Sequence, residues 1–157
     1  MFVSWLHVLA LTAYLGAVFG LWAVVFPSLA AVESREARLK LLGRSLKLYN
    51  PIQCGALGLI VLTGAIGVTD LKAAYRGSFA EEFGAMLGVK LLFAFVLILL
   101  STYQSMGVAL RFVRRYEGGE AITPQELDSV AKRLRSSTLP LLLLSAATVW
   151  MGLELRR

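Results

Sequence analysis

Four long stretches of the chain carry almost no charge, and they constrain its fold more than any other feature. They run through residues 2–29, 51–71, 84–110 and 138–154, with Lys90 as the one charged residue deep inside any of them. A helix that crosses a membrane needs about 20 apolar residues, with a range of about 17 to 25. Hydrophobic residues make up 57% of the chain, against about 45 to 50% in soluble domains. We therefore predict one all-α domain over residues 1–157, an antiparallel bundle of four transmembrane helices.

The basic residues of the connecting segments predict the orientation of these helices. One side of the predicted membrane carries Arg35, Arg38, Lys40, Arg44 and Lys47 in the first connection and Arg111, Arg114, Arg115, Lys132, Arg133 and Arg135 in the third, whereas the other side carries Lys72, Arg76, Arg156 and Arg157. Basic residues accumulate in cytoplasmic loops. We therefore expect a multi-pass protein of the plasma (inner) membrane with both termini outside (periplasmic). Attraction to anionic headgroups accounts for the net charge of +6 without nucleic acid.

Both basic connections have the pattern of amphipathic helices. Thr123, Pro124 and Glu126 form a capping box with proline at the first helical position, which predicts a helix start. Leucines and valine recur at helical spacing, at Leu39, Leu42 and Leu46 in the first connection and at Leu127, Val130 and Leu134 in the third. We expect cytoplasmic amphipathic helical extensions that lie at the membrane interface, with a start or kink at Pro51 and a kink at Pro140.

Lys90 is a candidate functional residue because an ionisable side chain inside a membrane span is costly. Its ammonium either extends back to the outer interface or pairs with an anionic group inside the bundle. Ser101, Gln104 and Ser105 lie within about 60° of Lys90 at 100° per residue. This polar face predicts that the Lys90 side of the third helix lines the bundle interior.

His7, the single histidine, falls in the outer half of the first helix, at a depth predicted to match that of Lys90. It is either a neutral imidazole bonded to a neighbouring helix or a group that binds a ligand or handles a proton. Tyr14, seven residues later, shares its face and is a candidate cofactor contact. Gly16 and Gly20 form a GxxxG on nearly the opposite side, which packs against another helix or forms a homo-oligomer contact.

These residues resemble a known group of membrane proteins. The segment IVLTGAIGVTDLKAAYRGSFAEEFGAMLGVKLLFAFVLILL, with its Thr-Gly, Phe-Gly and lysine, resembles the copper resistance D (CopD) domain. A histidine early in the first helix together with Lys90 is similar to the HemJ-type protoporphyrinogen oxidase family. The resemblance implies a small helical bundle in which His7 and Lys90 match an intramembrane His and Lys, with a b-type haem and oxidoreductase activity on a porphyrinogen. Thr102-Tyr103-Gln104 stands where that family is expected to carry a Tyr-His pair.

The available ligands restrict the cofactor. One histidine per chain cannot supply the axial ligands of two haems, but His7 can hold one haem with a methionine, a tyrosine or an open sixth position. The alternative is copper bound by His7 with Met86 or Met151, because imidazole and thioether ligands suit Cu(I). Lys90 favours haem, since an ammonium attracts a propionate and repels a metal cation. A haem-binding or redox membrane protein is thus predicted, with a copper-handling protein without catalysis and a non-catalytic partner subunit as alternatives.

Overall fold

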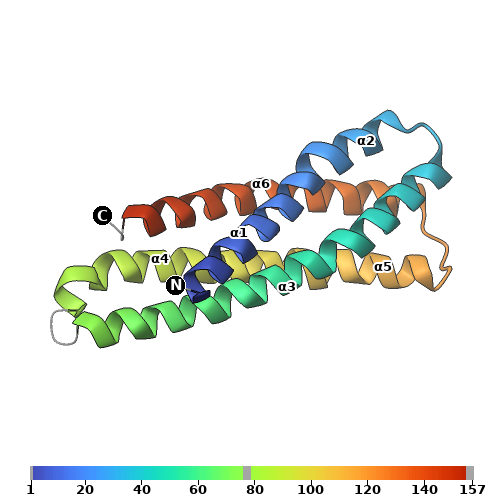
Figure 1. The fold of residues 1–157 in the computed structure, drawn as a ribbon. Coiled ribbons are helices and arrows are strands. Elements are labelled where there is room, and N and C mark those ends of the chain that lie inside the picture. The colour runs from blue at the N-terminus through green and yellow to red at the C-terminus, as the bar shows by residue number, and fades with distance from the viewer. Residues whose placement is uncertain (1, 76–78, 155–157) are drawn as a thin grey trace.

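The computed structural model is a bundle of four long helical segments (Figure 1), and it describes residues 2–75 and 79–154. The first segment comprises α1 (Phe2–Gly20), the π-helical turn η1 (Leu21–Val25) and α2 (Phe26–Ala31), and the second is α3 (Arg35–Tyr75). The third comprises α4 (Phe79–Thr102), the π-helix η3 (Tyr103–Ala109) and α5 (Leu110–Glu117), and the fourth is α6 (Pro124–Glu154). All four segments are long and apolar enough to cross a membrane. The predicted all-α, multi-pass bundle is confirmed.

The bundle has two chemically different ends. The connections at 32–34 and 118–123 meet at one end, called the basic end here because the basic residues flank them. The C-terminal end of α3, the N-terminal end of α4 and the two ends of the described chain lie toward the other end, the termini end (Figure 1). Arg76, Arg156 and Arg157, which the charge prediction counts on this side, fall outside the described residues.

The helices are longer than the sequence pattern predicts. Helix α3 has 41 residues and continues through Pro51, and α6 has 31 residues and continues through Pro140. At 1.5 Å per residue α3 is about 60 Å long, about twice the hydrocarbon thickness of a bilayer. The amphipathic extensions are therefore continuous with the spans at both prolines, so a new helix does not begin at Pro51, and their place at the membrane interface stays a prediction.

The reason is that the extensions pack on one another. A hydrophobic cluster at the basic end joins every segment, and its buried members include Phe26, Leu42, Leu46, Phe112, Leu127 and Leu134. Leu42, Leu46 and Leu134 are at most 1% exposed. This burial outweighs the single backbone hydrogen bond that a proline removes from a helix.

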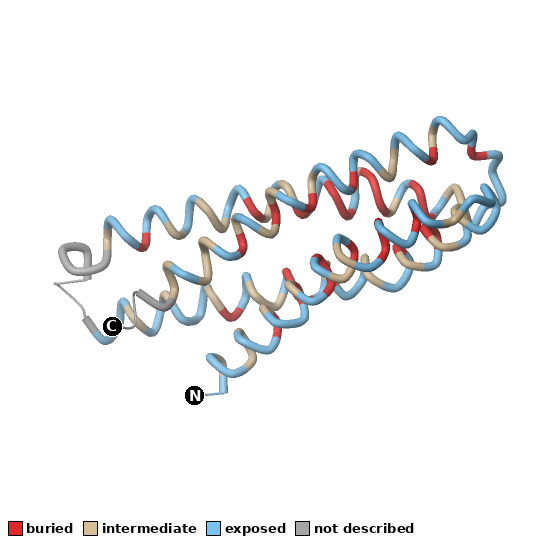
Figure 2. Tube along the Cα trace, turned by 90° about the horizontal axis from the view of Figure 1, so that it is seen from above, coloured by how far each residue is buried: buried red, intermediate tan, exposed pale blue. Residues whose placement is uncertain are grey.

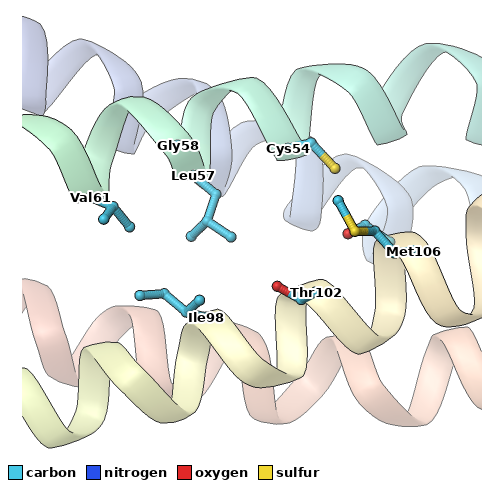
Figure 3. A pocket seen from close by; sticks show the side chains of 8 residues that line it. Cys54, Leu57, Gly58, Val61, Ile98, Thr102 and Met106 are labelled. Atoms are coloured by element: carbon cyan, nitrogen blue, oxygen red, sulfur yellow. The ribbon is translucent and has the colours of Figure 1, made fainter.

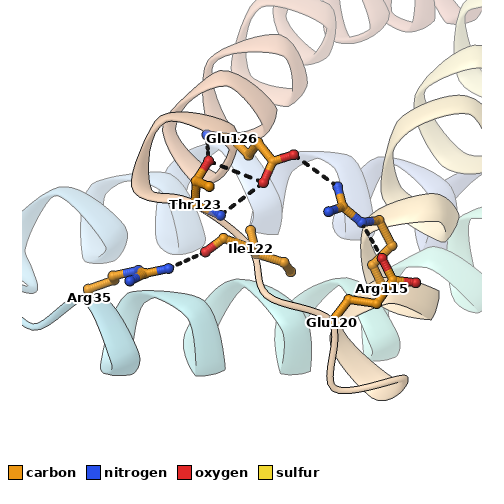
Figure 4. A network of polar contacts seen from close by, with 6 residues as sticks. All are labelled: Arg35, Arg115, Glu120, Ile122, Thr123 and Glu126. Atoms are coloured by element: carbon orange, nitrogen blue, oxygen red, sulfur yellow. Dashed lines mark hydrogen bonds and ion pairs between the residues drawn. The ribbon is translucent and has the colours of Figure 1, made fainter.

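Polar contacts close the basic end above this cluster (Figure 4). The predicted capping box is confirmed, because the Glu126 backbone N–H donates to the Thr123 hydroxyl and the Thr123 N–H donates to the Glu126 carboxylate. Arg115 donates to Glu120 at 2.8 Å and to Glu126 at 3.3 Å. Arg35 donates to the Ile122 carbonyl. The loop at 118–123 is thereby fixed to α3, α5 and α6.

Burial falls off toward the termini end, as Figure 2 shows. A second buried cluster fills the middle of the bundle around Tyr14, Val18 and Leu141. Nearer the termini the buried described side chains are few, chiefly Thr63 and Leu87. Trp5 and Trp150 are 74% and 68% exposed, the exposure typical of aromatic residues at a membrane interface.

Candidate functional site

His7 is held by helix α3. Its Nδ1 lies 2.7 Å from the Thr63 hydroxyl, and its Cε1 lies against Gly64, where a Cβ would be only 3.6 Å away. Helix α1 packs most extensively on α3, so the closest helix pair of the bundle orients this imidazole. His7 itself is half-buried.

The contacts of the Thr63 hydroxyl favour one tautomer of the neutral His7 imidazole. Thr63 donates its one hydroxyl hydrogen within its own helix, to the Leu59 carbonyl at 2.6 Å, with the Ile60 carbonyl at 3.2 Å. Because these carbonyls can only accept, all three contacts of the hydroxyl are satisfied when Nδ1 of His7 donates to it. In the neutral imidazole this places the lone pair on Nε2, the arrangement by which proteins orient a histidine that binds a metal.

Lys90 lies against helix α6. Its Nζ is 3.2 Å from where a Cβ on Gly152 would stand, so the missing side chain at Gly152 lets the ammonium approach the α6 backbone. The Lys90 side chain is half-buried. The Lys90 side chain contacts α6, whereas the His7 side chain contacts α3. The predicted approach of these two residues to each other stays a prediction.

Lys90 and the threonine that holds His7 stand at different distances from the centre of the bundle along their helices. Gln53, Gln104 and Thr138 are hydrogen-bonded in one layer and so share a level. Thr63 stands ten residues beyond Gln53, about 15 Å, whereas Lys90 stands fourteen residues before Gln104, about 21 Å. Counted along the helices, Lys90 is therefore further from the central layer than the Thr63 side chain that holds His7, and the common level of His7 and Lys90 stays a prediction.

A buried polar layer crosses the centre of the bundle. The Gln104 amide donates to the Thr138 hydroxyl at 2.7 Å and accepts from the Gln53 amide at 3.3 Å, and Gln53 also donates to Ser101 at 3.2 Å. All four side chains are at most 2% exposed. Gln104 and Ser105 sit in η3, consistent with the tendency of π-helical turns to occur at special sites. The predicted polar face of the third helix is confirmed as interior.

Tyr14 belongs to this central layer. It is 1% exposed, and its hydroxyl is buried near Ser101 and Gln53 without a hydrogen bond to any described residue. Its predicted place on the interior wall is confirmed. It lies two turns from His7 along α1, about 10 Å, so it stands below the His7 site.

A shallow groove of about 260 Å³ separates α3 from α4 and η3 beside this layer (Figure 3). It is lined by Cys54, Leu57, Gly58, Val61, Ile98, Thr102, Ser105 and Met106. Val61 and Met106 are 45% and 56% exposed, so the groove opens on the outer surface of the bundle. Neither His7 nor Lys90 lines it.

The two methionines considered as copper ligands are placed differently. Met86 is 44% exposed on the bundle surface, and Met151 is half-buried in α6. The described residues contain no group of three or more His, Cys, Asp and Glu side chains that could hold a metal ion. Of the candidate ligands, the His7 imidazole is therefore the one on which a metal or haem site can be built.

The two glycines of the GxxxG have separate surroundings. A Cβ on Gly20 would lie 3.1 Å from the Tyr49 ring, so this glycine allows α1 to pack closely on α3 within the chain. Gly16 is exposed and has no described atom within 4 Å of such a Cβ. The face of Gly16 alone remains for the predicted contact between copies of the chain.

Thr63, Gln53 and Thr138 were not predicted as site residues. Gln53 had a signal in the sequence, because an amide inside an apolar span needs a buried partner. The hydroxyls had none, since threonines in such helices ordinarily bond to their own backbone, as Thr69 and Thr148 do.

A scan against protein-family models and searches of curated proteins and of solved structures found no match to this chain.

Proposed function

We propose that this chain is a redox membrane protein that binds one b-type haem at its termini end, through the His7 Nε2. The observation that carries the proposal is the relay from His7 through Thr63 to the Leu59 carbonyl. It supports a metal-binding role because, with Nδ1 as the donor to Thr63, the lone pair lies on Nε2 and the ring is held in place. When bound, haem supplies one-electron chemistry.

Lys90 supports the same proposal from the opposite helix pair. The propionate groups of a haem stand at the edge of the ring, away from the iron. A cation that stands further from the central layer than the Thr63 side chain that holds His7 is suitably placed to pair with a propionate, and charge-assisted hydrogen bonds of this kind are the strong ones. Lys90 would thus bind the carboxylate while His7 binds the iron.

The donor set favours haem over copper. A Cu(I) site needs two or more soft ligands close together, and Met86, one of the candidates, is 44% exposed. Haem supplies four equatorial nitrogens itself and needs one strong axial ligand from the protein. We further propose that the termini end faces the outer side of the plasma membrane, because the excess of basic residues marks the other end as cytoplasmic.

Binding is tested on the purified full chain expressed with haem precursors. The wild type should show a Soret band with one haem per chain, and His7→Ala should lose it, because no second imidazole exists. Thr63→Val keeps the shape but removes the hydroxyl, and haem affinity should fall by about 10 to 100-fold. Thr69→Val is the matched control, since Thr69 lies on the same helix and bonds only the Ala65 carbonyl among the described residues.

Three results count against the proposal. A wild-type protein that takes up no haem refutes it, and copper bound in place of haem assigns the site to copper handling. Equal affinity losses in Thr63→Val and Thr69→Val remove the relay as its basis.

A further inference from the structure

Acidic and basic side chains at the basic end are unequally paired. Five carboxylates there have a cation within 4.0 Å: Glu36, Glu117, Glu120, Glu126 and Asp128. Seven exposed basic side chains at this end have no carboxylate within 4.0 Å among the described residues. One of them, Arg35, donates to the Ile122 carbonyl. The other six are called the basic belt: Arg44 on α3, Arg111 and Arg114 on α5, and Lys132, Arg133 and Arg135 on α6. Every carboxylate at this end except Glu33 is therefore paired with a cation outside the belt, and these carboxylates do not neutralise the belt.

The belt lies at one level of the bundle. Its three α6 members precede Thr138 of the central layer by three to six residues, which is about 5 to 9 Å along the helix. Its two α5 members follow Gln104 by about 10 to 15 Å, and its α3 member precedes Gln53 by about 14 Å. Three of the four helical segments therefore place unpaired cations about 5 to 15 Å from the layer.

The paired cations lie mostly further out. Arg38, Lys40 and Arg115 stand about 16 to 23 Å from the layer on the same scale. Lys47 is the exception, lying at the level of the belt and reaching Glu117 at 2.5 Å. Ion pairs raise the pKa of Lys47 and of Arg115 above their ordinary values, with Glu117 and Glu120 respectively as the main cause. The acidic residues of this end therefore form their ion pairs mostly further from the central layer than the belt, and the belt keeps a net positive charge.

The level of the belt coincides with the expected membrane boundary. From the central layer to Met151 near the termini end is thirteen residues, about 20 Å, and to Gly84 is twenty residues, about 30 Å. A hydrocarbon core about 30 Å thick therefore ends close to the layer on the basic side. Trp22, which is 39% exposed, follows Tyr14 by about 12 Å and stands at belt level, as interfacial tryptophans do.

We infer that the basic belt binds the phosphate groups of anionic phospholipids at the membrane surface. Six cations around three helical segments match a surface that encircles the bundle at this level, and guanidinium groups bind phosphate with two parallel hydrogen bonds. An anionic leaflet attracts such juxtamembrane cations. This inference is independent of haem binding.

The test uses the purified full chain in a neutral detergent, titrated with phosphatidylglycerol or with phosphatidylcholine, with bound lipid counted by native mass spectrometry. The wild type should bind phosphatidylglycerol more tightly. Each belt charge near the surface contributes about fivefold to affinity, reduced by salt, so R133Q/R135Q should weaken phosphatidylglycerol binding by about tenfold. R133K/R135K keeps both charges and should retain most of the binding.

The control K40Q/K72Q removes the same net charge from outside the belt, because Lys40 pairs with Glu36 and Lys72 lies near the termini end. It should change binding by less than about twofold. Equal losses in the two double variants, or equal binding of both lipids by the wild type, would overturn the inference. Displacement of the lipid by free inorganic phosphate would also overturn it, because the belt would then be a site for a soluble anion.

Discussion

The two ends of this bundle differ in how deeply their side chains are buried and in how firmly their connections are held. At the basic end, Leu42, Leu127 and Leu134 are at most 2% exposed, and a capping box and ion pairs fix the connecting loop. At the termini end, the described side chains are mostly exposed or half-buried, and the side chains with distinctive chemistry are His7 and Lys90. Regions with few buried contacts open most readily and are where ligands bind. We infer that the basic end and the central polar layer supply stability, whereas the termini end is available for a ligand.

The largest expected effect comes from the buried cluster at the basic end. Leu134→Ala leaves a cavity at a side chain that is 1% exposed, so the free energy of unfolding should fall by about 2 to 5 kcal/mol. Leu92→Ala, at a side chain that is 61% exposed toward the termini end, should change it by less than about 0.5 kcal/mol. Unfolding in mixed micelles, followed by tryptophan fluorescence, measures both. Equal losses in the free energy of unfolding in the two variants would contradict the proposed difference in stability between the two ends.

The central layer should contribute an intermediate amount. Gln104→Leu removes the hydrogen bonds to Thr138 and from Gln53, and should cost about 1 to 2 kcal/mol in the same unfolding assay. Tyr14→Phe removes a buried hydroxyl that bonds to no described residue, so stability should stay the same or rise. A marked loss in Tyr14→Phe would show that its hydroxyl has a partner, such as a buried water.

The two glycines of α1 should respond with opposite signs. Gly20→Ala forces a methyl group to within 3.1 Å of Tyr49 and should destabilise by about 1 kcal/mol, after the gain in helix propensity is subtracted. Gly16→Ala meets no described atom within 4 Å and should stabilise by about 0.5 to 1 kcal/mol. Sedimentation of both variants tests the predicted homo-oligomer: dissociation in Gly16→Ala would assign that face to a contact between copies.

The smallest expected effect is the pH dependence of the basic end. Hydrogen bonds from Thr123, then Arg115, lower the pKa of Glu126 below the ordinary 4.5. A lowered carboxyl pKa gives stability that is present above 4.5 and is lost as the pH falls through the native pKa. Glu126→Gln should therefore unfold more easily at neutral pH but lose less stability on acidification, a modest change because the group is exposed. An unchanged pH profile in the variant would show that other carboxylates dominate.

Some features of this structure can be predicted from the sequence alone, and others cannot. Four apolar runs predict four spans, and Thr123, Pro124 and Glu126 predict the start of α6, because membrane thickness and helix capping act locally. The continuation of α3 through Pro51 could not be predicted, since it depends on Leu42 and Leu46 packing against helices distant in sequence. Among the site residues, His7 and Lys90 stand out as unusual residue types. Thr63 does not, because its role depends on the register between α1 and α3.

The relay from His7 to Thr63 can be tested most directly by nitrogen NMR of the protein labelled at its single histidine. In the haem-free protein at neutral pH we expect Nδ1 to carry the proton and Nε2 to carry the lone pair, a preference that Thr63→Val should abolish and Thr69→Val should keep. Added haem should then perturb the Nε2 signal of the wild type first. A protonated Nε2 with the lone pair on Nδ1, unchanged in Thr63→Val, would contradict both the relay and the assignment of Nε2 as the ligand.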